Sequence, residues 1–232
     1  ATLDSRLFRR RMIGKQAMKI VVGGIKGGSG KTTVATNLAV LSARRQDVLL
    51  IDADDQETAT DFTVLRNERR PEGAGYTCIK LTGAAVRTET QRLTRKYDTI
   101  LIDTGGRDTT SQRAALTVAD VLLVPFVPRS FDLWTLEKVA ALVEEMRTAN
   151  PQLTAYVFLN RADPRGQDND ESVAMLKESS SLEFLNAPLG TRKAFANAAA
   201  QGLSVVELKP PDAKASEEIM TLYQRVLNEN PT

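Results

Sequence analysis

The sequence predicts a doubly wound α/β fold, in which a mostly parallel β-sheet is flanked by helices, and two observations carry this prediction. Five short apolar runs are bounded by polar or turn residues, which is typical of strands buried on both faces of a parallel sheet. These runs cover residues 19–23, 48–52, 99–103, 121–126 and 155–159. Helical stretches lie between the runs, and strand–helix alternation of this kind is typical of an α/β sandwich.

Helical spacing of apolar residues is clearest in three stretches. Val34, Leu38 and Leu41 share one face of a helix that is predicted directly after a glycine-rich loop. The stretch that ends before Asn150 and the stretch over residues 219–227 show the same spacing. Because no linker or composition shift interrupts this alternation, we expect a single domain over residues 18–232.

Composition excludes several kinds of site and setting. The chain has no histidine and a single cysteine, Cys78, so imidazole catalysis, an internal disulfide and a cysteine-ligated cluster are all excluded. No apolar run approaches the length of a membrane span. A reducing, cytoplasmic setting fits these features.

The net charge of +2 hides an uneven distribution of charge. Of 31 basic and 29 acidic residues, residues 1–17 carry five basic residues and one acidic residue, so the remainder carries 26 and 28 and is close to neutral. We expect residues 1–17 to form a flexible basic extension. Nucleic-acid binding by the remainder would have to come from a local basic patch.

Residues 24–33, G-I-K-G-G-S-G-K-T-T, join the first strand to the first helix. Glycines let backbone N–H groups curl around phosphate oxygens, and the start of the helix adds its positive dipole end. The expected phosphate cradle consists of Gly27, Gly28, Ser29 and Gly30. Lys31 would reach the β- and γ-phosphates of a nucleotide, Thr32 would ligate Mg²⁺, and Thr33 would lie near the α-phosphate.

Acidic residues end two of the predicted strands, at the sheet edge where nucleotides bind in open α/β sheets. Asp103 follows an apolar strand, as in a Walker B motif, and would hold a water on Mg²⁺. Gly105 and Gly106 come next and would let the backbone approach the γ-phosphate. Asp52 and Asp54 lie at the end of the earlier strand. The alternative is that this acidic segment only caps the N-terminus of a helix over residues 58–67.

Residues 26–32, K-G-G-S-G-K-T, resemble the deviant Walker A motif of the ParA/MinD superfamily of P-loop ATPases. The resemblance covers nearly everything from Met18 onward and is strongest to ParA-type plasmid and chromosome partition ATPases. It implies ATP and Mg²⁺ as cofactors and an ATP-bound homodimer. It also implies that Lys26 reaches across the dimer to the partner's phosphates, where a second cation would stabilise charge.

Residues 52–56, D-A-D-D-Q, resemble the switch I segment of this superfamily, which is usually D-x-D-P-Q. The resemblance implies that Asp54 orients or activates the attacking water, and that Asp52 supports the Mg²⁺ shell and the loop. Asp55 stands where proline is usual, so we expect a less rigid loop. Asn160 matches the base-binding position and implies an adenine contact, although residues 158–163 also loosely match the N-K-x-D signature of GTPases.

ParA-like dimers bind nonspecific DNA through basic residues of their C-terminal part, whose contributions add through phosphate neutralisation. The resemblance therefore suggests six residues for DNA contact, namely Arg161, Arg165, Arg192, Lys193, Lys209 and Lys214. A membrane-binding relative would instead end in a basic amphipathic helix. Here Glu217 and Glu218 lie on the polar side of the last predicted helix, so we expect its apolar stripe to pack on the core and no membrane binding.

Together, these features predict a nucleoid-associated ATPase that segregates or positions a plasmid, chromosome or other cargo. It would bind DNA when loaded with ATP and release it when a ParB-like partner protein stimulates hydrolysis. The main alternative is a MinD-like or other deviant-Walker switch without DNA binding. A GTPase, a nucleotide-binding scaffold without turnover, and a metabolic or metal-trafficking enzyme also stay open.

Overall fold

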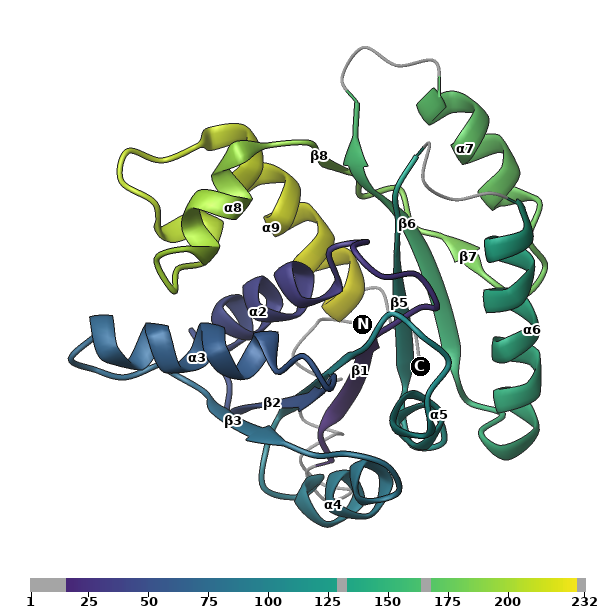
Figure 1. Cartoon of the computed structure of the whole chain (residues 1–232), viewed down its shortest axis with the longest axis horizontal. Coiled ribbons are helices and arrows are strands. Elements are labelled where there is room, and N and C mark those ends of the chain that lie inside the picture. The colour runs from purple at the N-terminus through teal and green to yellow at the C-terminus, as the bar shows by residue number, and fades with distance from the viewer. Residues whose placement is uncertain (1–15, 129–132, 164–167, 229–232) are drawn as a thin grey trace, which may run out of the picture.

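The computed structural model describes residues 16–128, 133–163 and 168–228, and it confirms the doubly wound α/β fold (Figure 1). Within these ranges eight strands form the sheet, in the order β3-β2-β4-β1-β5-β6-β7, with β8 paired to β6. The recorded strand pairs are all parallel. Strand order reverses beside β1, which lies between β4 and β5, and this is the position at which open α/β sheets bind their ligands.

The central strands coincide with the predicted apolar runs to within a few residues. They are β1 (Met18–Val22), β2 (Val48–Ala53), β4 (Thr99–Thr104), β5 (Val121–Phe126) and β6 (Thr154–Ala162). The sequence did not predict three short strands, β3 (Thr77–Lys80), β7 (Glu183–Phe184) and β8 (Leu189–Gly190). These strands are two to four residues long and only partly buried, so they lack the continuous apolar run of a central strand.

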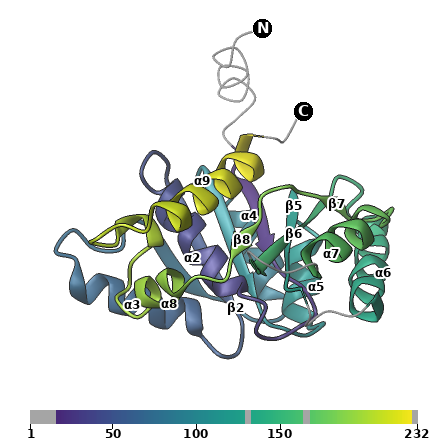
Figure 2. The same ribbon diagram turned by 90° about the horizontal axis from the view of Figure 1, so that it is seen from above.

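Helices cover both faces of the sheet, and Figures 1 and 2 show α2 and α9 on one side and α5 and α6 on the other. The first layer contains α2 (Lys31–Ser42), α3 (Thr58–Arg69), α8 (Lys193–Ala199), the 3-10 helix η1 (Val205–Glu207) and α9 (Ala213–Asn228). The second contains α4 (Ala85–Leu93), α5 (Thr110–Leu116), α6 (Leu133–Ala149) and α7 (Asp168–Lys177). Each layer packs on its own buried apolar cluster.

The last helix, α9, packs on the core, as the sequence predicted. Its Ile219, Leu222 and Val226 are fully buried in the same apolar cluster as Leu38 of α2. None of the helices in the described ranges combines the length and the apolar character that a membrane span requires. Of the predicted basic extension, residues 1–15 lie outside the described residues.

The register of the sheet places Asp52, Asp103 and the start of the phosphate loop at the same edge of the sheet. Asp103 of β4 is paired with Val22 of β1 on one side and with Asp52 of β2 on the other. Because parallel strands end at the same edge, the loop that follows β1 starts directly beside Asp103, with Asp52 one strand further away.

Arg66 joins α3 to a segment 136–141 residues further along the chain. Its side chain is only 4% exposed and forms a bidentate ion pair with Glu207 of η1, with N–O distances of 2.7 and 2.9 Å. It also donates to the carbonyl oxygens of Ala74 and Gly202, each at 2.9 Å. Arg66 therefore makes four hydrogen bonds to two separate segments, one more than the three donors of a lysine ammonium could supply.

The same 3-10 helix is bound to α2 through Asn37. The Asn37 Oδ1 accepts hydrogen bonds from the Ser204 hydroxyl at 2.8 Å and from the Val205 amide at 2.9 Å. Its Nδ2 donates to the Thr33 carbonyl at 2.7 Å. The segment around η1 is thus connected both to the helix after the phosphate loop and to the helix after the acidic loop.

We expect the Arg66→Met substitution to destabilise the protein by about 3 kcal/mol, because it leaves a largely buried carboxylate without its main partner. The matched control is Arg69→Met on the same helix, since Arg69 is exposed and makes one long hydrogen bond, to Ala200. Urea denaturation of both variants measures the difference. Equal stability of the two variants would contradict the assigned role of Arg66.

The destabilisation by Arg66→Met should also depend on pH. Burial alone would raise the pKa of Glu207, but the Arg66 and Ser204 hydrogen bonds and the charges of Arg66 and Arg70 lower it overall. A lowered carboxyl pKa stabilises the folded state above the unfolded-state value of about 4.5, and this contribution disappears as the pH falls below it. The difference in the free energy of unfolding between wild type and Arg66→Met should therefore become smaller as the pH is lowered.

Candidate nucleotide-binding site

The phosphate loop depends on glycine for its backbone geometry, most clearly in its second half. Gly28 and Gly30 have φ angles of 74° and 87°, in the left-handed region that other residues rarely adopt. Gly30 has a second constraint, because a Cβ atom there would lie 2.4 Å from the Asn160 Nδ2. The helix α2 begins at the next residue, so the amides of its first turn point towards the loop.

Lys31 lies inside this loop. Its side chain is buried, and its Nζ donates to the Lys26 carbonyl at 2.9 Å. Burial lowers the pKa of Lys31, while the carboxylates of Asp103 and Asp54 act in the opposite direction without reversing the shift. The ammonium group therefore lies between the loop and the acidic strand ends, and its contact with nucleotide phosphates stays a prediction.

Asp103 is fully buried, and neither of its carboxylate oxygens has a hydrogen-bond partner of ordinary geometry among the described residues. Its pKa is raised to about 7, mainly by burial and in part by the charges of the neighbouring Asp52 and Asp54. The Thr32 hydroxyl and the Lys31 ammonium lower this pKa, but by less. Such a carboxylate needs an external partner at neutral pH.

These residues fit a Mg²⁺ ion that is held mainly by phosphate oxygens and water. The described residues contain no cluster of three or more acidic, cysteine or histidine ligands. Mg²⁺ in nucleotide sites keeps several waters and takes only one or two ligands from the protein. The Thr32 hydroxyl and the two unpartnered oxygens of Asp103 match this requirement.

Asp52 is fully buried and holds the acidic loop that sequence analysis compared with switch I. It accepts hydrogen bonds from the Thr60 amide and the Thr60 hydroxyl, both at 2.8 Å, and from the Asp54 amide at 3.2 Å. Helix N-capping, the alternative role for this acidic segment, is therefore met by Asp52, which accepts from the Thr60 amide in the first turn of α3. Asp55 is exposed, and the N-cap residue Glu57 makes no side-chain cap.

Asp54 and the two glycines after Asp103 bring three loops into contact. A Cβ atom on Gly105 would lie 3.0 Å from the Asp54 Oδ1. A Cβ atom on Gly106 would lie 2.5 Å from the Gly27 nitrogen and Cα. The glycines therefore let the segment after β4 touch both the carboxylate of Asp54 and the backbone of the phosphate loop.

Asn160 anchors the phosphate loop in this structure. Its Nδ2 donates to the Ser29 carbonyl at 2.6 Å, and its Oδ1 accepts from the Arg161 amide at 3.0 Å. The side chain expected at the adenine is thus engaged with the loop from the end of β6. Its contact with a base stays a prediction.

Sequence analysis missed Gln112, a fully buried residue of α5. Its Oε1 accepts a hydrogen bond from the amide of Gly24, the first residue of the phosphate loop. A single glutamine in a seven-residue helix gives no pattern from which this contact could be found. Only the packing of α5 under the loop reveals it.

The residues suggested for DNA contact divide into two groups. A groove of about 1000 Å³ between α8 and residues 208–214 is lined by four of them, Arg192, Lys193, Lys209 and Lys214. Arg161 is exposed at the end of β6 and does not line this groove, and Arg165 lies outside the described residues.

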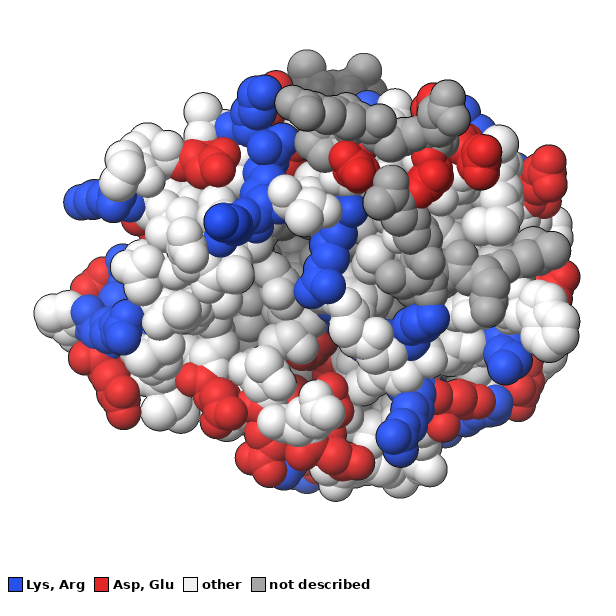
Figure 3. All heavy atoms as spheres, turned by 45° about the horizontal axis from the view of Figure 1, so that its top comes forward, with Lys and Arg blue, Asp and Glu red and all other residues white. Residues whose placement is uncertain are grey.

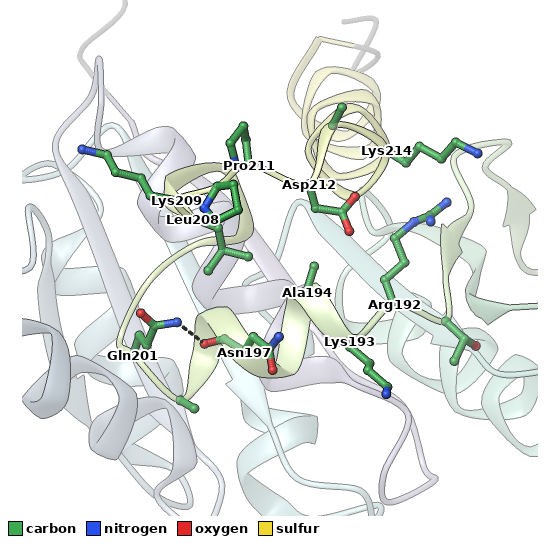
Figure 4. Close-up of a pocket in the computed structure, with 14 residues that line it drawn as sticks. Arg192, Lys193, Ala194, Asn197, Gln201, Leu208, Lys209, Pro211, Asp212 and Lys214 are labelled. Atoms are coloured by element: carbon green, nitrogen blue, oxygen red, sulfur yellow. Dashed lines mark hydrogen bonds between the residues drawn. The ribbon is translucent and has the colours of Figure 1, made fainter.

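Figure 4 shows Lys209 and Lys214 at opposite ends of the groove, with Asp212 between them and Lys193 on the α8 side. Arg192 is engaged by Glu218, with its Nε 2.9 Å from the Glu218 Oε2, so its charge is already balanced. In the wider view of Figure 3, Lys and Arg side chains run down the middle of the face and Asp and Glu lie along its lower edge. The charge of the surface is therefore mixed, with local basic stretches.

The burial of Asp103 predicts that the site lowers the stability of the nucleotide-free protein. Its pKa rises from 3.8 to about 7 on folding, so its destabilising effect grows as the pH rises through this window and is complete above it. We expect Asp103→Asn to raise the free energy of unfolding at about pH 8 by about 1 kcal/mol or more. Thermal denaturation at several pH values measures this change, and the gain should shrink towards acid pH.

Asp120→Asn is the matched control for this effect. Asp120 accepts hydrogen bonds from the Lys19 amide at 2.7 Å and from its ammonium at 2.9 and 3.0 Å. Removing a paired charge should lower stability, so the two substitutions have opposite expected signs. A lower stability of Asp103→Asn at alkaline pH would contradict the account of Asp103.

Comparison with known proteins agrees with this geometry. Residues 20–205 match the family described as the CobQ/CobB/MinD/ParA nucleotide binding domain. The maintenance of carboxysome distribution protein A of Gloeobacter kilaueensis is 31% identical, over 88% of this chain and 89% of that protein. The protein of the same name from Halothiobacillus neapolitanus is 26% identical, over 93% and 99%.

A solved structure of a Cyanothece McdA variant in complex with ATP has the same fold. It matches with a TM-score of 0.75 at 20% identity, over 93% of this chain and 98% of that one. The family match, the relative at 31% identity and the phosphate loop beside Asp103 lead to one assignment. This chain belongs to the CobQ/CobB/MinD/ParA family of nucleotide-binding domains.

Proposed function

We propose that this protein is a ParA-like positioning ATPase that dimerises on ATP, binds DNA nonspecifically and hydrolyses ATP when a partner protein stimulates it. The observation that carries the proposal is the buried Lys31 beside the unpartnered carboxylate of Asp103, at the mouth of a loop that holds a second lysine, Lys26. A loop with two lysines suits a nucleotide shared between two copies of the chain.

Each residue of the site has a distinct role in this proposal. The loop amides and Lys31 bind the phosphates, and Thr32 and Asp103 hold the Mg²⁺ shell. Bound Mg²⁺ would neutralise the charge that develops on the phosphate oxygens. Asp54 orients the attacking water, while Asp52 fixes the loop that carries Asp54 through its hydrogen bonds to Thr60 and to the Asp54 amide.

The cargo that we propose is a protein assembly moved over the nucleoid in the cytoplasm. Two relatives that match most of the chain are named for carboxysome distribution, which favours positioning of a protein cargo over plasmid partition. A small partner protein with the role of ParB would bind the ATP-loaded dimer and stimulate hydrolysis. Plasmid or chromosome segregation is the second candidate, because a further relative, 29% identical over 61% of this chain, is the chromosome-partitioning ATPase Soj of Thermus thermophilus.

The basic groove is the surface that we propose for DNA. Lys193, Lys209 and Lys214 are exposed and line the groove, where their positive charges would attract a phosphate backbone. Arg192 contributes mainly to structure, because Glu218 balances its charge. The groove is also connected to the nucleotide site, since η1 precedes it and is bound to α2 and α3 through Asn37 and Arg66.

Lys26→Ala tests the dimeric part of the proposal. We expect this variant to bind Mg²⁺–ATP within about threefold of wild type as a monomer, because Lys31 and the loop amides remain. ATP-dependent dimerisation should be lost and kcat should fall by about 100-fold or more, as for other cations that act in trans. Light scattering after size exclusion, with Lys138→Ala on α6 as the control, measures the first effect. A Lys26→Ala dimer in ATP would contradict the trans role.

DNA retention tests the switch. Wild-type protein should be retained on nonspecific duplex DNA with ATP but not with ADP, and salt should weaken retention. The combined Lys209→Glu and Lys214→Glu substitutions should weaken it by about tenfold or more, while Lys138→Glu on the opposite layer should not. A dimer that forms with ATP and is never retained would favour the alternative, a nucleotide switch without DNA binding.

A further inference from the structure

Gln112 lies in the first turn of α5, and its side chain joins two segments of the nucleotide site. Its Oε1 accepts a hydrogen bond from the Gly24 amide at 3.1 Å and another from the Thr104 hydroxyl at 3.0 Å. Gly24 begins the phosphate loop, and Thr104 directly follows Asp103 at the end of β4. One oxygen atom thus links the start of the loop to the end of the Walker B strand.

The backbone of Gln112 is fixed to the segment that follows this strand. Thr109 is the N-cap residue of α5, and its hydroxyl accepts a hydrogen bond from the Gln112 amide at 3.1 Å. The side chain of Gln112 reaches Gly24, so a displacement of residues 105–109 would be passed directly to the entry of the phosphate loop. Gly106 provides a second contact between the same segments, against the Gly27 backbone.

The space around the carboxamide is narrow. A Cβ atom on Gly23 would lie 3.2 Å from the Gln112 Oε1, 3.1 Å from the Thr104 Oγ1 and 3.0 Å from a methyl carbon of Leu122. These neighbours confine the carboxamide, so its oxygen has little freedom to leave the two donors.

The amide nitrogen of Gln112 indicates that the interactions of this side chain are made by its oxygen. The Nε2 of Gln112 is buried and has no hydrogen-bond partner in the part of the chain that the structure describes. A buried donor without a partner costs free energy, which leucine or methionine at this position would avoid. Packing alone is therefore a poor reason for a glutamine here.

We propose that Gln112 is a positioning residue for ATP hydrolysis, which holds the first amide of the phosphate loop in register with the Walker B strand and with residues 105–109. It acts through Gly24 and Thr104 and is not itself a catalytic residue. This inference rests on the proposed ATPase function. It adds a route by which a partner that moves residues 105–109 changes the phosphate loop.

The test is a double-mutant cycle in the full chain, with Gln112→Met and Thr104→Val alone and combined. Each single substitution removes the shared hydrogen bond and should lower kcat by about tenfold, with KM changed by less than about threefold. Because both remove the same interaction, the double variant should lose much less than the hundredfold that independent effects would give. Thr104→Ser keeps the hydroxyl and should retain near wild-type kcat.

Asn150→Leu is the matched control for the loss of a hydrogen-bonded, partly buried carboxamide. Asn150 donates to the Leu116 and Ala119 carbonyls at 2.8 and 2.7 Å, at the other end of α5 and away from the phosphate loop. It should lower the free energy of unfolding, measured in urea, and leave kcat unchanged. A purely structural role of Gln112 would give the same result for Gln112→Met.

Wild-type kcat in Gln112→Met, fully additive losses in the cycle, or an equal loss of kcat in Asn150→Leu would each overturn the inference and leave the proposed function standing. Absence of ATP hydrolysis by the wild-type protein would overturn the proposed function and this inference with it. The wild-type assay is therefore run first, with Mg²⁺–ATP and without Mg²⁺.

Discussion

A buried carboxylate at the carboxyl edge of the sheet is the feature around which the nucleotide site is arranged. Asp103 has no solvent exposure, no hydrogen-bond partner for its oxygens among the described residues, and a second carboxylate, Asp52, paired beside it in the sheet. Burial without a partner is unfavourable for a charge, and Lys31 offsets it only in part. The folded chain thus holds a buried negative charge that a Mg²⁺–nucleotide would neutralise. The nucleotide-free protein is less stable for it, at the place where binding is needed.

The phosphate loop is held from both ends by side-chain amides from distant elements. Gln112 of α5 accepts from the first residue of the loop, and Asn160 at the end of β6 donates to Ser29 near its last turn. Between these anchors, Gly27 is in contact with Gly106, so the loop touches the segment after β4 as well. A loop of backbone amides binds phosphates well only if those amides are already in position, and these three contacts supply that positioning.

The C-terminal part of the chain is connected to the nucleotide site by a small number of polar contacts. Glu207 of η1 forms an ion pair with Arg66 of α3. Ser204 and Val205 donate hydrogen bonds to Asn37 of α2. The first of these helices follows the acidic loop, and the second follows the phosphate loop. The basic groove begins directly after η1, so both nucleotide-contacting loops have a physical connection to it. This arrangement suits the proposed coupling between nucleotide state and DNA binding.

The sequence by itself determined the fold class, the five central strands, the phosphate loop and the acidic strand ends. Each of these follows from local chemistry: continuous apolar runs, glycines before a lysine, and carboxylates at strand ends. Only the tertiary structure decided that Asp52 caps α3, that Asn160 anchors the loop, and that Gln112 joins α5 to Gly24. It also decided that Arg192 forms an ion pair with Glu218. Such contacts join residues up to 131 positions apart, and a side chain's partner at that distance depends on packing rather than on its neighbours in the sequence.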